Sequence, residues 1–239
     1  MTSKYKGTLY GVGVGPGDPD LITLKAARLI SNATTIAYPA PEGGDSFARD
    51  IAKAHIAEGT KEISIAVPMR PERKAAQDAY DVGAVEVRAQ LEAGNDVVFL
   101  CEGDPFFYGT FMYLYDRLAG DFETDIIPGV TSIVACACRL KQPLVSRNDV
   151  LTVLAGPMSD EELEARLKLG GSFAIMKVGR HLPRLRSLLE KLDLMKRAGY
   201  VERATLANEK AIPLAELEDA TAPYFSMILI YDGDEAWKN

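Results

Sequence analysis

The class of fold follows from one segment near the start of the chain, Leu9-Tyr10-Gly11-Val12-Gly13-Val14-Gly15-Pro16-Gly17-Asp18-Pro19-Asp20. It predicts a strand over residues 8–14 that runs into a glycine-rich loop, after which residues 21–27 open a helix. Glycines in such a loop permit positive φ angles and let the backbone approach a ligand closely. Strand, glycine loop and helix in this order commonly form the ligand site of an open α/β sheet.

The composition of this loop argues against a phosphate site. A dinucleotide fingerprint needs G-x-G-x-x-G, but the sixth position is Pro16 when counted from Gly11 and Asp18 when counted from Gly13. Proline has no N–H to offer a phosphate. Asp18 and Asp20 would repel an anion and suit helix capping instead. The loop therefore predicts a ligand that is not strongly anionic; a tight turn without a ligand is the alternative.

Composition limits the classes of protein. The chain has 239 residues, 47% of them hydrophobic, which fits one large domain or two small ones. Its net charge of −7 and pI near 5.0 argue against general nucleic-acid binding. No segment approaches the ~18 apolar residues of a membrane span, and the N-terminus lacks a signal-peptide core. Three irregularly spaced cysteines favour a reducing, cytoplasmic location.

The pattern of strands and helices predicts two α/β domains, residues 1–143 and 144–239, with a largely parallel sheet in the first. The strand and helix pattern of the second domain starts near Lys141-Gln142-Pro143. Strands are expected at residues 8–14, 34–38 (ended by Pro39), 62–67, 96–101, 124–127, 149–155, 172–178, 199–206 and 226–231. Helices are expected at residues 23–31, 47–57, 71–93, 107–118, 160–169 and 183–192.

A second loop, Cys101-Glu102-Gly103-Asp104-Pro105-Phe106-Phe107-Tyr108-Gly109, follows its strand as the first loop does. Ligands in open sheets bind outside the carboxyl ends of the strands. The aromatic residues could wall a pocket for a large flat molecule, whereas Phe111 and Leu114 are interpreted as core residues. The site residues expected in this loop are Gly103, Asp104 and Tyr108.

A third loop, Ile127-Pro128-Gly129-Val130-Thr131-Ser132, again joins a strand to the start of a helix. Thr131 or Ser132 can cap that helix, and the same hydroxyl groups could hold a ligand carboxylate or amine. Since this is the third such loop at one sheet edge, both roles can hold together.

These segments resemble the tetrapyrrole (corrin/porphyrin) methyltransferase family. The resemblance rests on residues 11–17 with Leu21-Ile22-Thr23-Leu24-Lys25-Ala26, on Glu102-Gly103-Asp104-Pro105 and on Pro128-Gly129-Val130-Thr131-Ser132, and it covers nearly the whole chain. Within the family, residues 100–111, Ala135-Cys136-Ala137-Cys138-Arg139 and Ser146-Arg147-Asn148-Asp149 are most similar to enzymes that methylate carbon 20 of precorrin-2 or cobalt-factor II in cobalamin biosynthesis.

The resemblance implies two α/β domains with S-adenosylmethionine between them, in a homodimer that binds a tetrapyrrole substrate. Pro16 would line the cofactor cleft, main-chain groups of residues 102–104 would hold the methionine end or the ribose, and residues of the second domain would meet the adenine. Many family members carry Trp-Pro or Arg-Pro where this chain has Leu206-Ala207. The cofactor residues that the resemblance implies are Pro16, Glu102, Gly103, Asp104, Tyr108, Thr131, Ser132, Val178, Leu206 and Ala207.

The methyl group on the sulfonium of this donor is a reactive electrophile, and the donor carries no phosphate. A loop that contains proline, and so offers fewer N–H groups, agrees with such a ligand. Transfer to a meso carbon needs in-line positioning and exclusion of water more than a strong base, and the sequence names no base. The polycarboxylate substrate requires local positive charge, for which Arg70, Arg139, Arg147 and Arg180 are candidates and Arg147 is preferred. The substrate residues expected are Gly15, Arg139 and Arg147.

Other chemistries have weaker support. His55 and His181 are too far apart in sequence for a metal site, and Cys136 and Cys138 are interpreted as small core residues of a helix. No metal is expected other than cobalt carried by the substrate. The alternatives that stay open are a uroporphyrinogen-III methyltransferase or an enzyme for another ring carbon, a binding module without catalysis, and a relative that methylates protein or ribosomal RNA.

Overall fold

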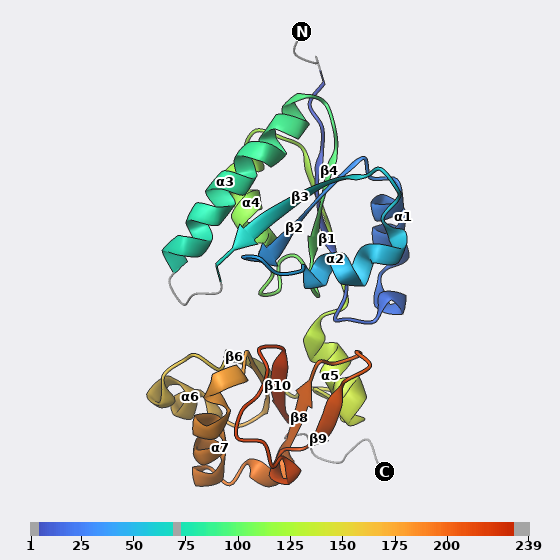
Figure 1. The fold of residues 1–239 in the computed structure, drawn as a ribbon. Helices are drawn as coiled ribbons and strands as arrows, with labels where there is room; N and C mark the ends of the chain where they lie inside the picture. Colours follow the sequence, from blue (N-terminus) through green and yellow to red (C-terminus); the bar gives the residue numbers. More distant parts are fainter. Residues whose placement is uncertain (1–4, 69–72, 232–239) are drawn as a thin grey trace. The chain divides into compact units, whose positions relative to one another are not determined.

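The computed structural model describes residues 5–68 and 73–231, and the chain divides into two compact units, Met1–Thr131 and Ser132–Asn239. Each unit contains a five-stranded sheet covered by helices (Figure 1). The predicted class, two α/β units, is confirmed. Within the described residues, no helix combines the length and the apolar character that crossing a membrane requires.

The first sheet has the strand order β3-β2-β4-β1-β5, and every neighbouring pair is parallel. This confirms the predicted parallel sheet. The order also places β4, β1 and β5 side by side, so that the loops that leave their carboxyl ends emerge at one edge. The strands are β1 Leu9–Gly13, β2 Thr35–Pro41, β3 Lys61–Val67, β4 Val97–Cys101 and β5 Thr124–Ile127.

Helices cover both faces of the first sheet (Figure 1). On one face α1 (Leu24–Ser31) and α2 (Phe47–Ala52) bury Ala26, Ile30 and Ile51 with Leu100 of β4. On the other face α3 (Arg73–Glu92) and α4 (Phe111–Leu118) bury a second cluster that includes Tyr80, Phe111 and Leu114, which confirms the core assignment of the last two. Short 3-10 turns follow β1 (η1, Pro19–Leu21) and α2 (η2, Lys53–His55).

Three expected boundaries in the first unit are wrong. The helix expected at residues 47–57 ends as α2 at Ala52 and is followed by the 3-10 turn η2. Strand β2 does not end at Pro39 but continues to Pro41, paired with β3. The Thr34 carbonyl accepts from Lys61, so even-numbered residues of β2 turn their backbone groups to β3 and Pro39 faces the other side, where pairing with β4 has stopped at Ala37. A missing N–H costs nothing there. Helix α4 starts at residue 111 rather than 107, because the preceding residues form an irregular loop.

The second sheet is mixed, with the order β6-β7-β10-β8-β9 and only the β6–β7 pair parallel. Its strands are β6 Leu151–Ala155, β7 Ser172–Met176, β8 Ala198–Glu202, β9 Lys210–Pro213 and β10 Ser226–Ile230. β9 was not predicted from the sequence, and the strand expected at residues 199–206 ends at Glu202, because the residues after it form turns. Its helices are α5 Ser132–Leu140, α6 Asp160–Leu167 and α7 Leu182–Lys191, with 3-10 turns η3 Gly179–His181, η4 Met195–Arg197 and η5 Leu214–Glu216.

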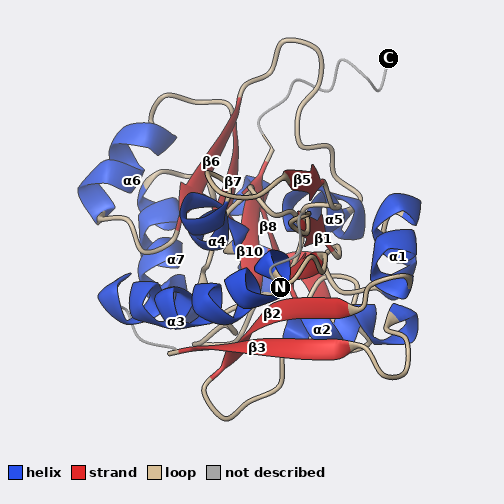
Figure 2. Ribbon diagram, turned by 90° about the horizontal axis from the view of Figure 1, so that it is seen from above, coloured by secondary structure: helices blue, strands red, loops and turns tan. Residues whose placement is uncertain are grey.

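Helix α5 packs on β8, β9 and β10 and therefore belongs to the second unit. In Figure 2, α6 and α7 lie together on one side of the second sheet and α5 on the other. The Leu140 side chain of α5 lies directly over Gly199 of β8, where an added Cβ would stand 2.5 Å from a Leu140 methyl carbon. The division between the units thus falls at residues 131/132, ahead of the expected 143/144, because the contacts of α5 are invisible in local sequence.

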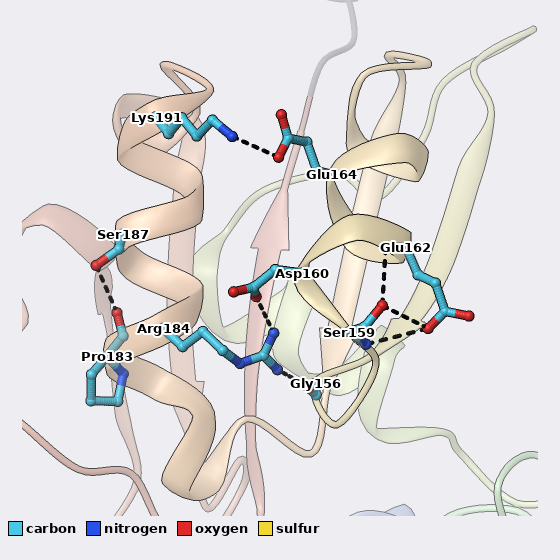
Figure 3. A network of polar contacts seen from close by, with 9 residues as sticks. All are labelled: Gly156, Ser159, Asp160, Glu162, Glu164, Pro183, Arg184, Ser187 and Lys191. Carbon is cyan, nitrogen blue, oxygen red and sulfur yellow. Dashed lines mark hydrogen bonds and ion pairs between the residues drawn. The ribbon is translucent and has the colours of Figure 1, made fainter.

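The helix expected at residues 160–169 forms as α6, and its first turn contains the acidic residues Asp160, Glu161 and Glu162. Ser159 and Glu162 form a capping box, with each side chain bonded to the backbone of the other (Figure 3). Further along, Glu164 accepts from Lys191 of α7 at 2.7 Å, and Arg184 pairs with Asp160. These carboxylates join α6 to α7 and are explained without a ligand.

We expect Gly199→Val to lower the free energy of unfolding by about 1–3 kcal/mol, since the added methyl groups overpack the contact with Leu140. Urea denaturation measures the change. In a Leu140→Ala background the cost should fall, because the shortened side chain leaves room. Gly120→Ala is the control, since nothing lies within 4 Å of its added Cβ. An equal cost in both backgrounds would contradict this packing of α5.

Candidate functional site

Two of the glycine loops are hydrogen-bonded to each other on the side of the first sheet where the carboxyl ends of the strands lie. The N–H of Gly15, after β1, donates to the Gly103 carbonyl at 3.2 Å, and the N–H of Gly103, after β4, donates to the Gly15 carbonyl at 2.7 Å. Both residues have positive φ, +80° and +64°. The structure therefore brings together Gly15, which was expected to bind the substrate, and Gly103, which was expected to bind the cofactor.

The third loop closes on the same point. A Cβ on Gly13 would lie 2.6 Å from both the Gly103 carbonyl oxygen and the Gly129 nitrogen, and a Cβ on Gly129 would lie 2.0 Å from that same oxygen. Three backbones meet here in van der Waals contact, so no side chain fits at Gly13 or Gly129. We call residues 13–17, 102–109 and 128–131 the loop junction.

Asp104 ties the junction together through its carboxylate. One oxygen accepts from the N–H groups of Phe106 and Phe107, both at 3.0 Å, and the other accepts from the N–H of Gly129 at 3.1 Å. This carboxylate thus fixes the turn of its own loop and holds the loop after β5. Asp104 therefore has a structural role in the first unit, and its expected role in cofactor binding stays a prediction.

Glu102 faces the opposite side of the sheet from Cys101 and reaches the first turn of α2. It is half-buried, and burial raises its pKa, while hydrogen bonds from its own N–H and from the N–H of Ala48 oppose the rise. Burial also raises the pKa of the neighbouring Cys101 thiol, to about 12. Cys101 is therefore an inert core residue, and Glu102 is the ionisable group of the pair.

Aromatic side chains surround the exposed part of the second loop. Phe106 is 47% exposed and meets Tyr115 edge to face at 5.3 Å, and Tyr108 is 43% exposed and meets Phe107 at the same distance. Tyr108 has φ +55°, uncommon for a bulky residue. These rings form an apolar surface that suits a large flat ligand.

The first loop contains no phosphate cradle. Pro16 is half-buried, and Asp18 caps η1 by accepting from the N–H of Asp20 at 2.9 Å, which confirms the capping interpretation. The Asp104 carboxylate already accepts from N–H groups of the second and third loops. A bound phosphate would need such N–H donors, and it would meet carboxylates here instead.

In the second unit, strained residues gather at the edge formed by the ends of β7 and β8 and the start of β10. Lys177, Arg203 and Thr205 are non-glycine residues with φ of +57°, +50° and +70°. The N–H of Val178 donates to Ser226 and that of Arg203 donates to Phe225. Each such conformation costs of order 1–3 kcal/mol and is typical of functional sites.

The predicted adenine residues lie on this edge with different exposure. Leu206 is half-buried and Ala207 is exposed, both in the loop after β8. Val178 is fully buried in the core of its unit, its N–H donates to Ser226 and its carbonyl accepts from His181, so neither its side chain nor its N–H is exposed to a ligand. Thr131 is half-buried at the end of the first unit, and Ser132 is the first residue of α5. The expectation that both units serve one cofactor stays a prediction.

The candidate arginines lie in different settings. Arg139 donates to Glu209 at 2.6 Å and so has a partner inside its own unit. Arg147, with φ +45°, is exposed in a turn that leads into the amino end of β6, away from the edge that holds Leu206. Arg180 is exposed in η3, directly after β7 and on that edge. Arg70 lies outside the described residues.

The cysteines and histidines carry no site. Cys136 is buried, and its pKa is raised to about 12 by burial, but Cys138 is exposed, so its assignment to the core is wrong. Two residues along a helix point to different faces. Within residues 5–68 and 73–231, no group of three or more His, Cys, Asp or Glu side chains is placed to hold a metal ion.

Sequence analysis missed Glu209 and Thr205. The Glu209 carboxylate accepts both from Arg139 and, at 2.6 Å, from the N–H of Thr205. Nothing in the local sequence marks Thr205 as left-handed, since glycine is the usual signal for that conformation.

The chain belongs to the tetrapyrrole (corrin/porphyrin) methylase family, whose model matches residues 8–219. It is 39% identical to a precorrin-2 C(20)-methyltransferase from Sinorhizobium sp, over 100% of this chain and 99% of that protein. It is 34% identical to a cobalt-precorrin-2 C(20)-methyltransferase from Salmonella typhimurium, over 94% and 96% of the two chains.

Other relatives are longer or more distant. The chain is 38% identical to the cobalamin biosynthesis protein CobIJ of Mycobacterium tuberculosis over 95% of its own residues, but it spans only 46% of that relative's length. Among solved structures it resembles the cobalt precorrin-4 methyltransferase CbiF, with a TM-score of 0.69 and 24% identity over 94% of both chains. That likeness shows the fold.

We expect Asp104→Asn to loosen the loop junction, because the amide nitrogen replaces one accepting oxygen and cannot accept a hydrogen bond. With the remaining oxygen bonded to the N–H groups of Phe106 and Phe107, the N–H of Gly129 loses its acceptor. Leaving a buried donor unpaired costs about 1–3 kcal/mol. Hydrogen exchange at the Gly129 amide should become faster and the melting temperature lower. Asp18→Asn is the control, since Asn caps a helix about as well as Asp. Unchanged exchange at Gly129 would contradict the role assigned to Asp104.

Proposed function

We propose that this chain transfers a methyl group from S-adenosylmethionine to carbon 20 of precorrin-2, or of its cobalt-containing counterpart, in cobalamin biosynthesis. The observation that carries the proposal is the end-to-end similarity to a relative named for this reaction. The glycine loops and the family match support methyl transfer to a tetrapyrrole at the coarser level.

The residues of the junction fit this donor. S-adenosylmethionine supplies a methyl group on a positively charged sulfur and carries no phosphate. A junction with Asp18, Glu102 and Asp104 around packed backbone suits a cation better than an anion. Gly15, Gly17 and Gly103 carry no side chain, so a bound donor can approach the backbone of residues 15–17 and 102–104 closely.

In this proposal the chain's residues position the two reactants and shield them from water, and they do not activate either reactant chemically. Main-chain groups of residues 102–104 with Pro16, Tyr108, Thr131 and Ser132 bind the donor, and the loop that contains Leu206 and Ala207 meets its adenine. The rings of Phe106 and Tyr108 cover the flat face of the tetrapyrrole and exclude water. Holding the two reactants in line supplies up to ~7–11 kcal/mol of barrier lowering.

The main alternative within the family is a uroporphyrinogen-III methyltransferase. The two relatives named for carbon 20 differ in whether their substrate name includes cobalt. The assay must therefore compare three tetrapyrroles: uroporphyrinogen III, metal-free precorrin-2 and cobalt-factor II.

The resemblance also implies a homodimer, which sedimentation of the purified protein tests.

We expect the purified protein to bind S-adenosylhomocysteine with about one site per chain and an affinity in the ~micromolar class. Isothermal calorimetry measures this. With a ¹³C-methyl donor, NMR of the product should show the label on carbon 20 of precorrin-2 or cobalt-factor II. Label on uroporphyrinogen III would favour the alternative, and binding without transfer to any of the three would leave a binding module.

We expect Arg180→Ala to raise the KM for the tetrapyrrole by ~10-fold or more, while Arg147→Ala changes it little. Arg180 is exposed at the edge that holds Leu206, whereas Arg147 leads into the amino end of β6. A forked pair with a substrate carboxylate is worth about 1.5–3 kcal/mol. Arg180→Lys should recover part of the loss. The reverse order of effects would restore Arg147 as the carboxylate ligand.

A further inference from the structure

The loop that follows β8 in the second unit is built from two successive turns. The N–H of Leu206 donates to the Arg203 carbonyl and the N–H of Glu209 donates to the Leu206 carbonyl, both at 3.0 Å. Thr205 is the third residue of the first turn, with φ +70°. Positive φ at that position ordinarily requires glycine or asparagine, and a β-branched residue is strongly disfavoured there.

The backbone of Thr205 is held by Glu209. One carboxylate oxygen of Glu209 accepts from the Thr205 N–H at 2.6 Å, and the other accepts from Nε of Arg139 on α5 at 2.6 Å. The Glu209 side chain is only 12% exposed, although that of Arg139 is 53% exposed. A carboxylate bonded at both oxygens and shielded from water makes strong, directional bonds.

The other end of the loop is anchored separately. The buried Glu202 accepts from Tyr200 at 2.5 Å and from Arg203 at 2.7 Å, and the N–H of Arg203 donates to Phe225. The first residue of the loop is thus fixed to β8 and to the segment before β10. Thr205 and the exposed tip with Leu206 depend on Glu209.

We propose that Glu209 is a positioning residue for the cofactor: by holding the left-handed backbone of Thr205, and being held in turn by Arg139, it presents Leu206 and Ala207 to the adenine of the methyl donor. This rests on the proposed function, which assigns the adenine to that loop. Arg139 then acts on the cofactor side through Glu209, rather than on a substrate carboxylate.

The test compares Glu209→Ala with Glu209→Gln, Thr205→Gly and the double variant Glu209→Ala/Thr205→Gly. Removing the acceptor should weaken binding of S-adenosylhomocysteine about tenfold and speed hydrogen exchange at the Thr205 amide in the ligand-free protein. Glu209→Gln keeps the volume and one acceptor oxygen, so it should lose less. Circular dichroism and the melting temperature show that each variant is folded.

The double variant gives the decisive readout. Glycine adopts positive φ without strain, so Thr205→Gly should restore most of the affinity that Glu209→Ala loses, while Thr205→Gly alone stays near the wild type. Lys210→Ala is the matched control: it removes the neighbouring ion pair with Asp219 and leaves Thr205 untouched, so it should change neither readout.

The outcomes separate this inference from the proposed function. A double variant as weak as Glu209→Ala, or unchanged affinity and exchange in Glu209→Ala, would overturn the positioning role. If the wild-type protein bound no S-adenosylhomocysteine, the proposed function would fail and the inference with it, even if exchange at Thr205 still depended on Glu209. Restored affinity in the double variant, with faster exchange in the single one, supports it.

Discussion

The close approach of three backbones at Gly13, Gly103 and Gly129 is the constraint on which the first unit's site depends. It follows from the strand order, since β4, β1 and β5 are adjacent and their loops leave the same edge. Without Cβ atoms the loops come close enough for the Gly15–Gly103 hydrogen bonds and for Asp104 to reach across to Gly129. These bonds use amides that a phosphate loop would keep for its ligand. The same packing that forms the junction thus limits it to ligands without strong negative charge.

The two units shape their loops by different physical means. In the first unit, Gly15 and Gly103 adopt positive φ without strain, and Tyr108, at +55°, is the only non-glycine residue of the loop junction with positive φ. The second unit places Lys177, Arg203 and Thr205 in the same region of φ/ψ space and must stabilise them by contacts. The carboxylates of Glu202 and Glu209 provide those contacts at two of the three positions. A loop held in this way responds to changes at a distance along the chain, such as Arg139 on α5.

This difference explains how much the sequence could predict. Glycine loops and strand runs are local patterns, so the parallel sheet and the gathering of three loops at one of its edges were predicted correctly, as were the core positions of Phe111 and Leu114. The contact between the three loop backbones was not predicted. The extension of β2 through Pro39, the existence of β9 and the place of α5 in the second unit depend on which neighbours pack there. The partners of Arg139 and Thr205 depend on contacts between separate elements. The amino-acid composition indicates the partner of neither residue.

Electrostatics sets a final condition on any polycarboxylate substrate, because the chain carries a net charge of −7. Most arginines are already committed to carboxylates or carbonyls of their own unit. Among the arginines whose side chains the structure describes, a set that leaves out Arg70 and Arg73, those without a hydrogen bond or ion pair are Arg28, Arg147, Arg166 and Arg180. Arg28 and Arg166 lie near the ends of α1 and α6, helices that run back toward the amino ends of their strands, and Arg147 precedes β6. Only Arg180 of these follows the carboxyl end of a strand, where loops gather to form sites. Arg180 is thus the arginine that the fold leaves exposed and unpaired at a loop edge, although the protein as a whole is acidic.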